Sequence, residues 1–101
     1  EFSYCSFLCS TFPGHESLWY HRRFLLSYWL RLLAQHRGTL DQQWVEQAAQ
    51  PELAFAEEQE RLAEKESSNG TAQQRQQQRR FGQAYKRWVE MERRALLAAA
   101  G

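Results

Sequence analysis

Two cysteines and three histidines are the residues of this 101-residue chain that most often carry catalysis or bind metal ions. Cys5 and Cys9 lie one helical turn apart, and the histidines are His15, His21 and His36. Nucleophilic catalysis needs a thiol or hydroxyl beside a positioned base, and no histidine has a nucleophile partner by spacing. Two cysteines without a further cysteine or a nearby histidine pair cannot complete a tetrahedral zinc site. The sequence therefore predicts no catalytic, cofactor-binding or metal-binding residue within this chain.

The spacing of Cys5 and Cys9 fits buried free thiols in a reducing compartment, although a helix could also bring the two side chains together. The first residues lack the basic flank and apolar stretch of a signal peptide. Charged residues interrupt the apolar run at 18–33, which excludes a membrane span there. We expect a cytoplasmic protein without a membrane-spanning segment.

The elements that position these side chains are expected to be helices, because the chain is rich in aromatic residues and has only five glycines and two prolines. A central helix is predicted over 16–36, between Pro13-Gly14 and Gly38. At 3.6 residues per turn, its large apolar residues form a face too wide for one neighbour to cover. This pattern indicates a helix packed on two sides, as in a stack of helix pairs.

Trp19 and Arg22 share one face of the central helix. An indole and a guanidinium three residues apart can stack or bridge to a neighbouring helix, so we interpret the pair as a joint between stacked helix pairs. The alternative is that Arg22 and Arg23 are solvated charges.

Further helices are expected over 2–12, 42–50, 52–66 and 72–99. Pro51 is predicted to end the helix before it, and the cluster at 67–70 is predicted to form a turn. In the last helix, Phe81, Tyr85 and Trp88 recur at spacings of three and four. We expect these three residues to pack as the single apolar stripe of an end-capping helix.

Charge is distributed unevenly along the chain, although the formal net charge is only +1. Residues 52–66 carry six acids and two bases, whereas residues 72–101 carry seven bases and two acids. A basic helix with interleaved aromatic residues is a candidate site for an acidic partner or RNA. The candidate contacts are Arg79, Arg80, Lys86 and Arg87. Nucleic acid is not the expected partner, because the aromatic residues lie on one stripe, as they would in a core.

The segment from Trp19 to Leu26, which follows Pro13, resembles the Trp-x-x-Arg signature of the protein prenyltransferase alpha subunit repeat, a helix pair of roughly 34 residues. The run from Gln78 to Trp88 strengthens the resemblance. It implies an all-α fold, an α-α superhelix of antiparallel helix pairs with a C-terminal capping helix. Residues 1–66 would hold the end of one repeat and one helix-pair repeat, 67–71 a linker turn, and 72–101 the capping helix. The repeat-motif packing residues would be Trp19, Arg22, Arg23, Phe24, Leu26 and Trp29.

The resemblance also implies a function. The chain would be the C-terminal repeat region of an alpha-type, non-catalytic subunit of a heterodimeric protein prenyltransferase, a transferase that moves farnesyl or geranylgeranyl groups to protein cysteines. It would act as a scaffold for a zinc-bearing β subunit. The isoprenoid diphosphate and the acceptor protein would meet it only through the complex. The alternative is a non-enzymatic helical interaction module.

One departure from the family pattern bears on this role. Some repeats of the family carry Asn-Tyr and a nearby lysine just ahead of the tryptophan, and these residues reach the diphosphate. This chain has His15 and Glu16 at the matching positions, with Gly14 where a lysine might stand. A glutamate would repel a diphosphate, so we expect this repeat to be structural.

Overall fold

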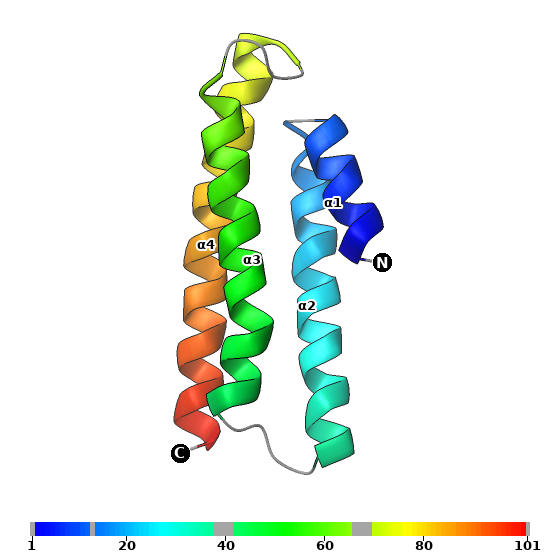
Figure 1. The fold of residues 1–101 in the computed structure, drawn as a ribbon, viewed down its shortest axis with the longest axis vertical. Coiled ribbons are helices and arrows are strands. Elements are labelled where there is room, and N and C mark those ends of the chain that lie inside the picture. Colours follow the sequence, from blue (N-terminus) through cyan, green and yellow to red (C-terminus); the bar gives the residue numbers. More distant parts are fainter. Residues whose placement is uncertain (1, 13, 38–41, 66–69, 101) are drawn as a thin grey trace.

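The computed structural model describes residues 2–12, 14–37, 42–65 and 70–100, and the regular elements in these ranges are all α-helices. α1 spans Phe2–Thr11, α2 Glu16–Arg37, α3 Gln42–Ala63 and α4 Ala72–Ala100. Successive helices run in opposite directions along an elongated molecule with extents of 46 × 22 × 17 Å (Figure 1). This arrangement confirms the predicted all-α fold of antiparallel helix pairs.

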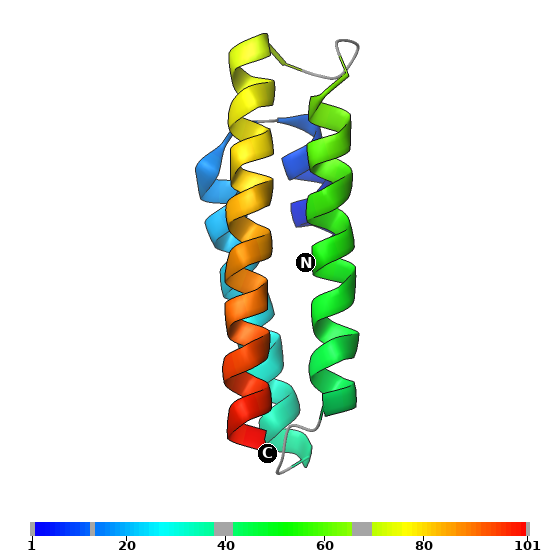
Figure 2. The same ribbon diagram turned by 90° about the vertical axis from the view of Figure 1, so that its left-hand side faces the viewer.

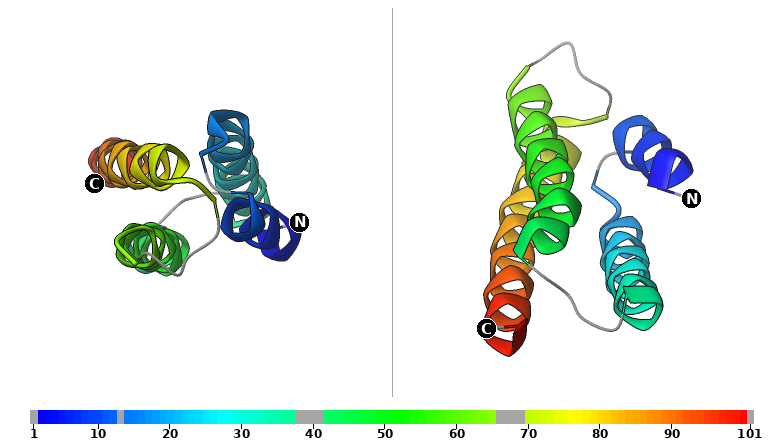
Figure 3. Two further views of the ribbon diagram at one scale, coloured as in Figure 1. Left: turned by 90° about the horizontal axis from the view of Figure 1, so that it is seen from above. Right: turned by 60° about the horizontal axis from the view of Figure 1, so that its bottom comes forward.

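The long helices α3 and α4 lie side by side (Figure 2). Seen from the end, the four helices occupy four corners, with α2 next to α4 and α1 on the side of α3 (Figure 3, left). The short helix α1 lies beside the N-terminal part of α2 and does not extend along the rest of that helix. A layer formed by α1 and α2 therefore packs on a layer formed by α3 and α4.

Two glycines shape the turns that precede α2 and α4. Gly14 has φ +84°, and a Cβ atom there would lie 3.1 Å from backbone atoms of Gln74. Gly70 has φ +91°. At the start of α4, the Thr71 hydroxyl accepts a hydrogen bond from the Gln74 N–H, and the Gln74 side chain accepts one from the Thr71 N–H. This reciprocal capping box begins α4 at Ala72, where the sequence predicted a helix start.

The predicted helix end at Pro51 is wrong, because α3 continues through this residue to Ala63. Pro51 is exposed, so its ring lies outside the buried face of α3. The residues before and after it form one buried stripe, which includes Val45, Ala49, Glu52 and Ala56. An interior proline costs about 3 kcal/mol, and burial of this stripe offsets that cost.

The core lies where α2 packs on α3 and α4. Its buried members are Trp19, Leu26, Leu30, Ala48, Ala49, Ala56, Tyr85 and Val89. Small residues bring α3 and α4 close together: a Cβ atom on Gly82 would lie 3.2 Å from the Ala56 carbonyl oxygen. A second cluster, formed by Cys5, Cys9 and Leu25, joins α1 to α2.

Candidate functional site

Trp19 lies in the first turns of α2 and is 3% exposed. Its ring lies 5.6 Å from the ring of Phe55 and 5.5 Å from that of Tyr85, measured between centroids. The indole N–H donates a hydrogen bond to Oε1 of Gln78 at 3.2 Å. The indole is thus enclosed by α3 and α4, with its single polar group satisfied.

Arg22 follows on the same face and is also 3% exposed. Its guanidinium makes a bidentate contact with Glu52 of α3, at 2.7 Å from Nε and 3.1 Å from Nη2. Nη1 donates to the Ser6 hydroxyl of α1 at 2.7 Å, and the guanidinium carbon lies 3.6 Å from the Phe55 ring centroid. One cation therefore contacts α1 and α3 together. Arg22 is therefore buried rather than solvated, and its side chain links α2 to both α1 and α3.

Tyr85 of α4 completes the ion pair. Its hydroxyl donates a hydrogen bond of 2.6 Å to Oε1 of Glu52. Burial raises the pKa of Tyr85, and the nearby Glu52 carboxylate adds to this effect. The phenol thus stays protonated and supplies the donor that the buried carboxylate needs.

Gln78 links the joint to the turn before α2. Its Oε1 accepts the backbone N–H of Gly14 at 2.9 Å as well as the Trp19 N–H. Its side-chain amide nitrogen donates to the Cys9 carbonyl oxygen at 2.9 Å and to Oε1 of Gln59 at 3.0 Å. Every polar atom of this buried side chain is therefore paired. Gln78 fixes α4 against α1, α2 and α3.

Sequence reasoning missed Glu52, Gln59 and Gln78 as members of this site. In the sequence, Glu52 belongs to the acidic segment 52–66, which suggests a surface position, and Gln78 lies in a glutamine-rich run. A signal was present for α3, because Glu52, Ala56 and Gln59 recur at helical spacing. If the apolar stripe of α3 is continued through Pro51, Glu52 and Gln59 fall on its buried face.

The two cysteines are free and buried, as the sequence predicted. The Cys5 thiol lies 3.6 Å from the Leu18 carbonyl oxygen. Its hydrogen bond with Cys9 lowers the pKa of Cys5, as does the Arg22 charge, while burial opposes both effects. The same hydrogen bond and burial raise the pKa of Cys9. Both thiols pack in the cluster that joins α1 to α2.

The remaining repeat-motif residues divide into two groups. Leu26 is buried, and the Arg23 guanidinium lies 5.0 Å from the Tyr20 ring and 5.4 Å from the Trp88 ring. By contrast, Phe24 is 61% exposed and Trp29 is 43% exposed, so neither belongs to the buried core of this chain. The neighbours of α2 therefore cover a narrower part of its surface than the apolar pattern predicted.

The capping-helix residues lie as predicted. Tyr85 is fully buried, and Phe81 and Trp88 are partly buried against the same core. Tyr85 and Trp88 stack with their centroids 5.8 Å apart. Together they form the apolar stripe that holds α4 to α2 and α3.

The four candidate contacts for an acidic partner are not equivalent. Arg80 and Arg87 are exposed. Lys86 is less accessible, with Nζ 2.9 Å from Oε1 of Glu60 on α3. Arg79 lies 3.9 Å from Glu64 in an exposed pair. The predicted acidic and basic segments thus face each other within the chain.

An exposed aromatic stripe runs along α2, formed by Tyr20, Phe24 and Tyr28. Each is more than half exposed. The rings of Phe24 and Tyr28 stack at 6.1 Å with an interplanar angle of 14°. Contiguous aromatic surface of this kind is typical of protein–protein interfaces.

His15 and His21 are exposed, and the side chain of His36 lies outside the described part of the chain. Among the described residues, no three histidine, cysteine, aspartate or glutamate side chains come together as metal ligands. Within those same ranges, no helix is long and apolar enough to cross a membrane.

Antiparallel helix pairs fastened by a buried Trp–Arg joint are the arrangement expected of a fragment of an α-α superhelix. Residues 1–29 match the model of the protein prenyltransferase alpha subunit repeat, so this part of the chain is similar to a repeat of that family. The match covers α1, the turn at Gly14, and α2 as far as Trp29, and it includes both members of the joint. No curated protein sequence and no solved structure matches the chain.

Proposed function

We propose that this chain is the C-terminal repeat region of an alpha-type subunit of a heterodimeric protein prenyltransferase. The observation that carries the proposal is the coincidence of the repeat match at residues 1–29 with the buried joint of Trp19 and Arg22. In this proposal α1 ends one repeat, α2 and α3 form the next, and α4 caps the stack. The buried free thiols favour a cytoplasmic location.

The assembled enzyme would transfer a farnesyl or geranylgeranyl group. The acceptor cysteine thiolate forms a bond to C1 of the isoprenoid, the C1–oxygen bond breaks, and diphosphate leaves. A zinc ion on the β subunit would lower the pKa of the acceptor thiol. The residues of this chain would contribute rigidity rather than chemistry. Glu16 is exposed near the start of α2, and its charge disfavours a diphosphate at that position.

The aromatic stripe of Tyr20, Phe24 and Tyr28 is the surface we assign to the β subunit. Permanent interfaces are enriched in aromatic residues and depleted of charge. The ring stacking between Phe24 and Tyr28 orders this surface before binding, which reduces the entropy lost on association.

Co-purification of the full-length protein with prenyltransferase β subunits tests the proposal. We expect a stable complex at micromolar concentrations, and loss of that complex in the double variant Phe24→Glu/Tyr28→Glu. The matched control is Arg31→Glu, an exposed change on the same helix. Circular dichroism should show that both variants remain folded. Failure to form a complex with any β subunit, at micromolar concentrations of both proteins, would overturn the proposal.

A further inference from the structure

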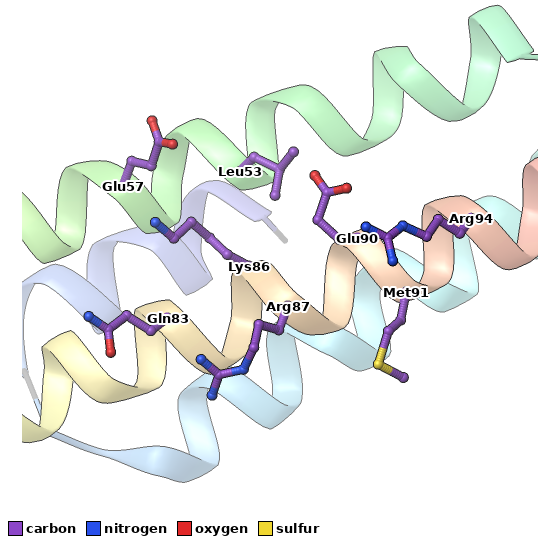
Figure 4. Close-up of a pocket in the computed structure, with 8 residues that line it drawn as sticks. All are labelled: Leu53, Glu57, Gln83, Lys86, Arg87, Glu90, Met91 and Arg94. Atoms are coloured by element: carbon purple, nitrogen blue, oxygen red, sulfur yellow. The ribbon is translucent and has the colours of Figure 1, made fainter.

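The outer face of the α3/α4 pair carries an open groove of about 620 Å³ (Figure 4). Leu53 and Glu57 line it from α3, whereas Arg87, Met91 and Arg94 line it from α4. In this view α2 lies behind the pair, so the groove faces away from the core. Met91 is 64% exposed, which places an apolar side chain in contact with water at the rim.

Some of the charges around the groove are balanced inside the chain. The Lys86 side chain points toward α3 (Figure 4), and its Nζ lies 2.9 Å from Oε1 of Glu60. On α4 itself, Glu90 accepts a hydrogen bond of 2.6 Å from Arg93. These residues therefore leave little charge for a partner to meet.

The remaining charges of the groove are Glu57, Arg87 and Arg94. All three are exposed, and none of them belongs to an ion pair among the described residues. Two bases therefore stand against one acid. Electrostatic complementarity favours a partner that is acidic where it meets α4.

The two arginines continue a longer row along the exposed side of α4. Arg80 is also exposed and belongs to no ion pair in the described part of the chain. Arg80, Arg87 and Arg94 are seven residues apart, which is nearly two helical turns, or about 10.5 Å along the axis for each step. A second helix packed alongside α4 repeats its facing residues at the same interval. The row therefore matches acids that recur every seven residues on a helix.

We propose that this groove binds an acidic amphipathic helix of another protein. The apolar side chains of that helix pack on Leu53, on Met91 and on the arginine stems. Its carboxylates, repeated at heptad spacing, meet the arginines in charge-assisted hydrogen bonds. Glu57 adds specificity, because it disfavours a partner that is acidic on every side. The groove shares no residue with the aromatic stripe of α2, so the inference does not rest on the proposed prenyltransferase role.

RNA fits the same surface less well. Binding of single-stranded RNA uses exposed aromatic rings on which the bases stack. The aromatic residues Phe81, Tyr85 and Trp88 instead pack against the core side of α4, and the residues that line the groove are aliphatic or polar. Glu57 also repels phosphate. The surface therefore favours a protein helix over RNA.

Fluorescence anisotropy with the full-length protein tests the proposal. The probe is a designed, labelled peptide of about three heptads, with glutamate at one position of each heptad and leucines on the adjoining face. We expect binding in the micromolar range at low salt. A peptide of the same composition, with its glutamates moved off this period, should bind at least about tenfold more weakly.

The double variant Arg87→Glu/Arg94→Glu should also weaken binding of the probe at least about tenfold, because like charges then face one another. It should instead bind the peptide in which lysine replaces each glutamate, which shows that the variant is folded. The matched control is Arg31→Glu, an exposed change on α2, which should bind the probe as the wild type does.

No binding of the probe at several hundred micromolar would overturn the proposal. Equal affinity for the rearranged peptide would do the same, since binding would then follow net charge alone. Tighter binding of a uridine oligonucleotide, lost in the same double variant, would assign the groove to RNA and exclude the acidic helix. None of these measurements involves a β subunit, so their outcome is independent of the proposed function.

Discussion

Arg22 of α2 is a cation buried among three helices. Its charge is balanced by Glu52, whose carboxylate also accepts the Tyr85 hydroxyl, and its flat face lies on Phe55. Desolvating such a pair costs several kcal/mol, so its value lies in specificity as much as in stability. In this arrangement of α1, α2 and α3 each charge has its partner.

Replacing Arg22 with methionine should therefore destabilise the chain severely. Arg22→Met leaves the Glu52 carboxylate buried without its counter-ion, and we expect the free energy of unfolding to fall by ~3–5 kcal/mol. Urea denaturation followed by circular dichroism measures this loss.

The double variant Arg22→Met/Glu52→Leu removes both charges and should recover most of the loss. Arg31→Met, at an exposed position of the same helix, serves as the control and should change little. A loss at Arg22 no larger than that of the control would show that the joint is not stabilised by this ion pair.

At the scale of the helices, the local tendency of Pro51 to end a helix opposes the packing of α3 along α4. Proline removes a backbone N–H and crowds the preceding turn, which usually ends a helix. α3 nevertheless continues, because its buried stripe spans both sides of the proline and packs along α4. In α4 the signals agree, since the Thr71 and Gln74 capping box and the apolar stripe indicate one helix.

Pro51→Ala should stabilise the protein. Alanine restores a helical N–H donor and relieves the crowding at an exposed site, so we expect the free energy of unfolding to rise by about 1–3 kcal/mol. A shift of the urea midpoint to higher concentration measures the gain. Gln47→Ala, an exposed change one turn earlier, is the control and should have a smaller effect. An unchanged or lower midpoint for Pro51→Ala would mean that the proline does not strain α3.

At the scale of the whole molecule, three kinds of surface are separated on different sides. Aromatic residues lie along α2, an acidic edge along α3, and a basic edge along α4. Between α3 and α4, ion pairs such as Lys86–Glu60 and Arg93–Glu46 span the junction. Partly exposed pairs contribute only ~0–1 kcal/mol each, whereas burial of one large side chain such as Tyr85 contributes ~1.5–3 kcal/mol.

The packing of the helices should therefore survive high salt. At 1 M salt the ion pairs are screened, because the Debye length falls to about 3 Å, but the buried contacts remain. We expect the near-ultraviolet circular dichroism of Trp19 and Tyr85, which reports a fixed core, to be retained. Urea at the same salt concentration should abolish it and provides the reference for an unpacked chain. Loss of the signal in salt alone would show that electrostatic pairs hold the helices together.

The sequence by itself determined the features that arise from neighbouring residues. The all-α class, the turn at Gly14, the start of α4 at Ala72, and the shared face of Trp19 and Arg22 all follow from capping residues and apolar periodicity. The burial of Cys5 and Cys9 was predictable for the same reason. Capping residues and apolar periodicity act within one or two helical turns. They can therefore be recognised without knowing which distant residues pack against the helix.

Only the tertiary structure decided which parts of each face are covered and by what. Arg22 meets a carboxylate 30 residues away, and Gln78 meets a carbonyl oxygen 69 residues away. Phe24 and Trp29 belong to an apolar face but remain exposed, and Pro51 lies inside a helix. The physical reason is that periodicity defines which side chains point the same way. The number and position of neighbouring helices determine which of them lose contact with water.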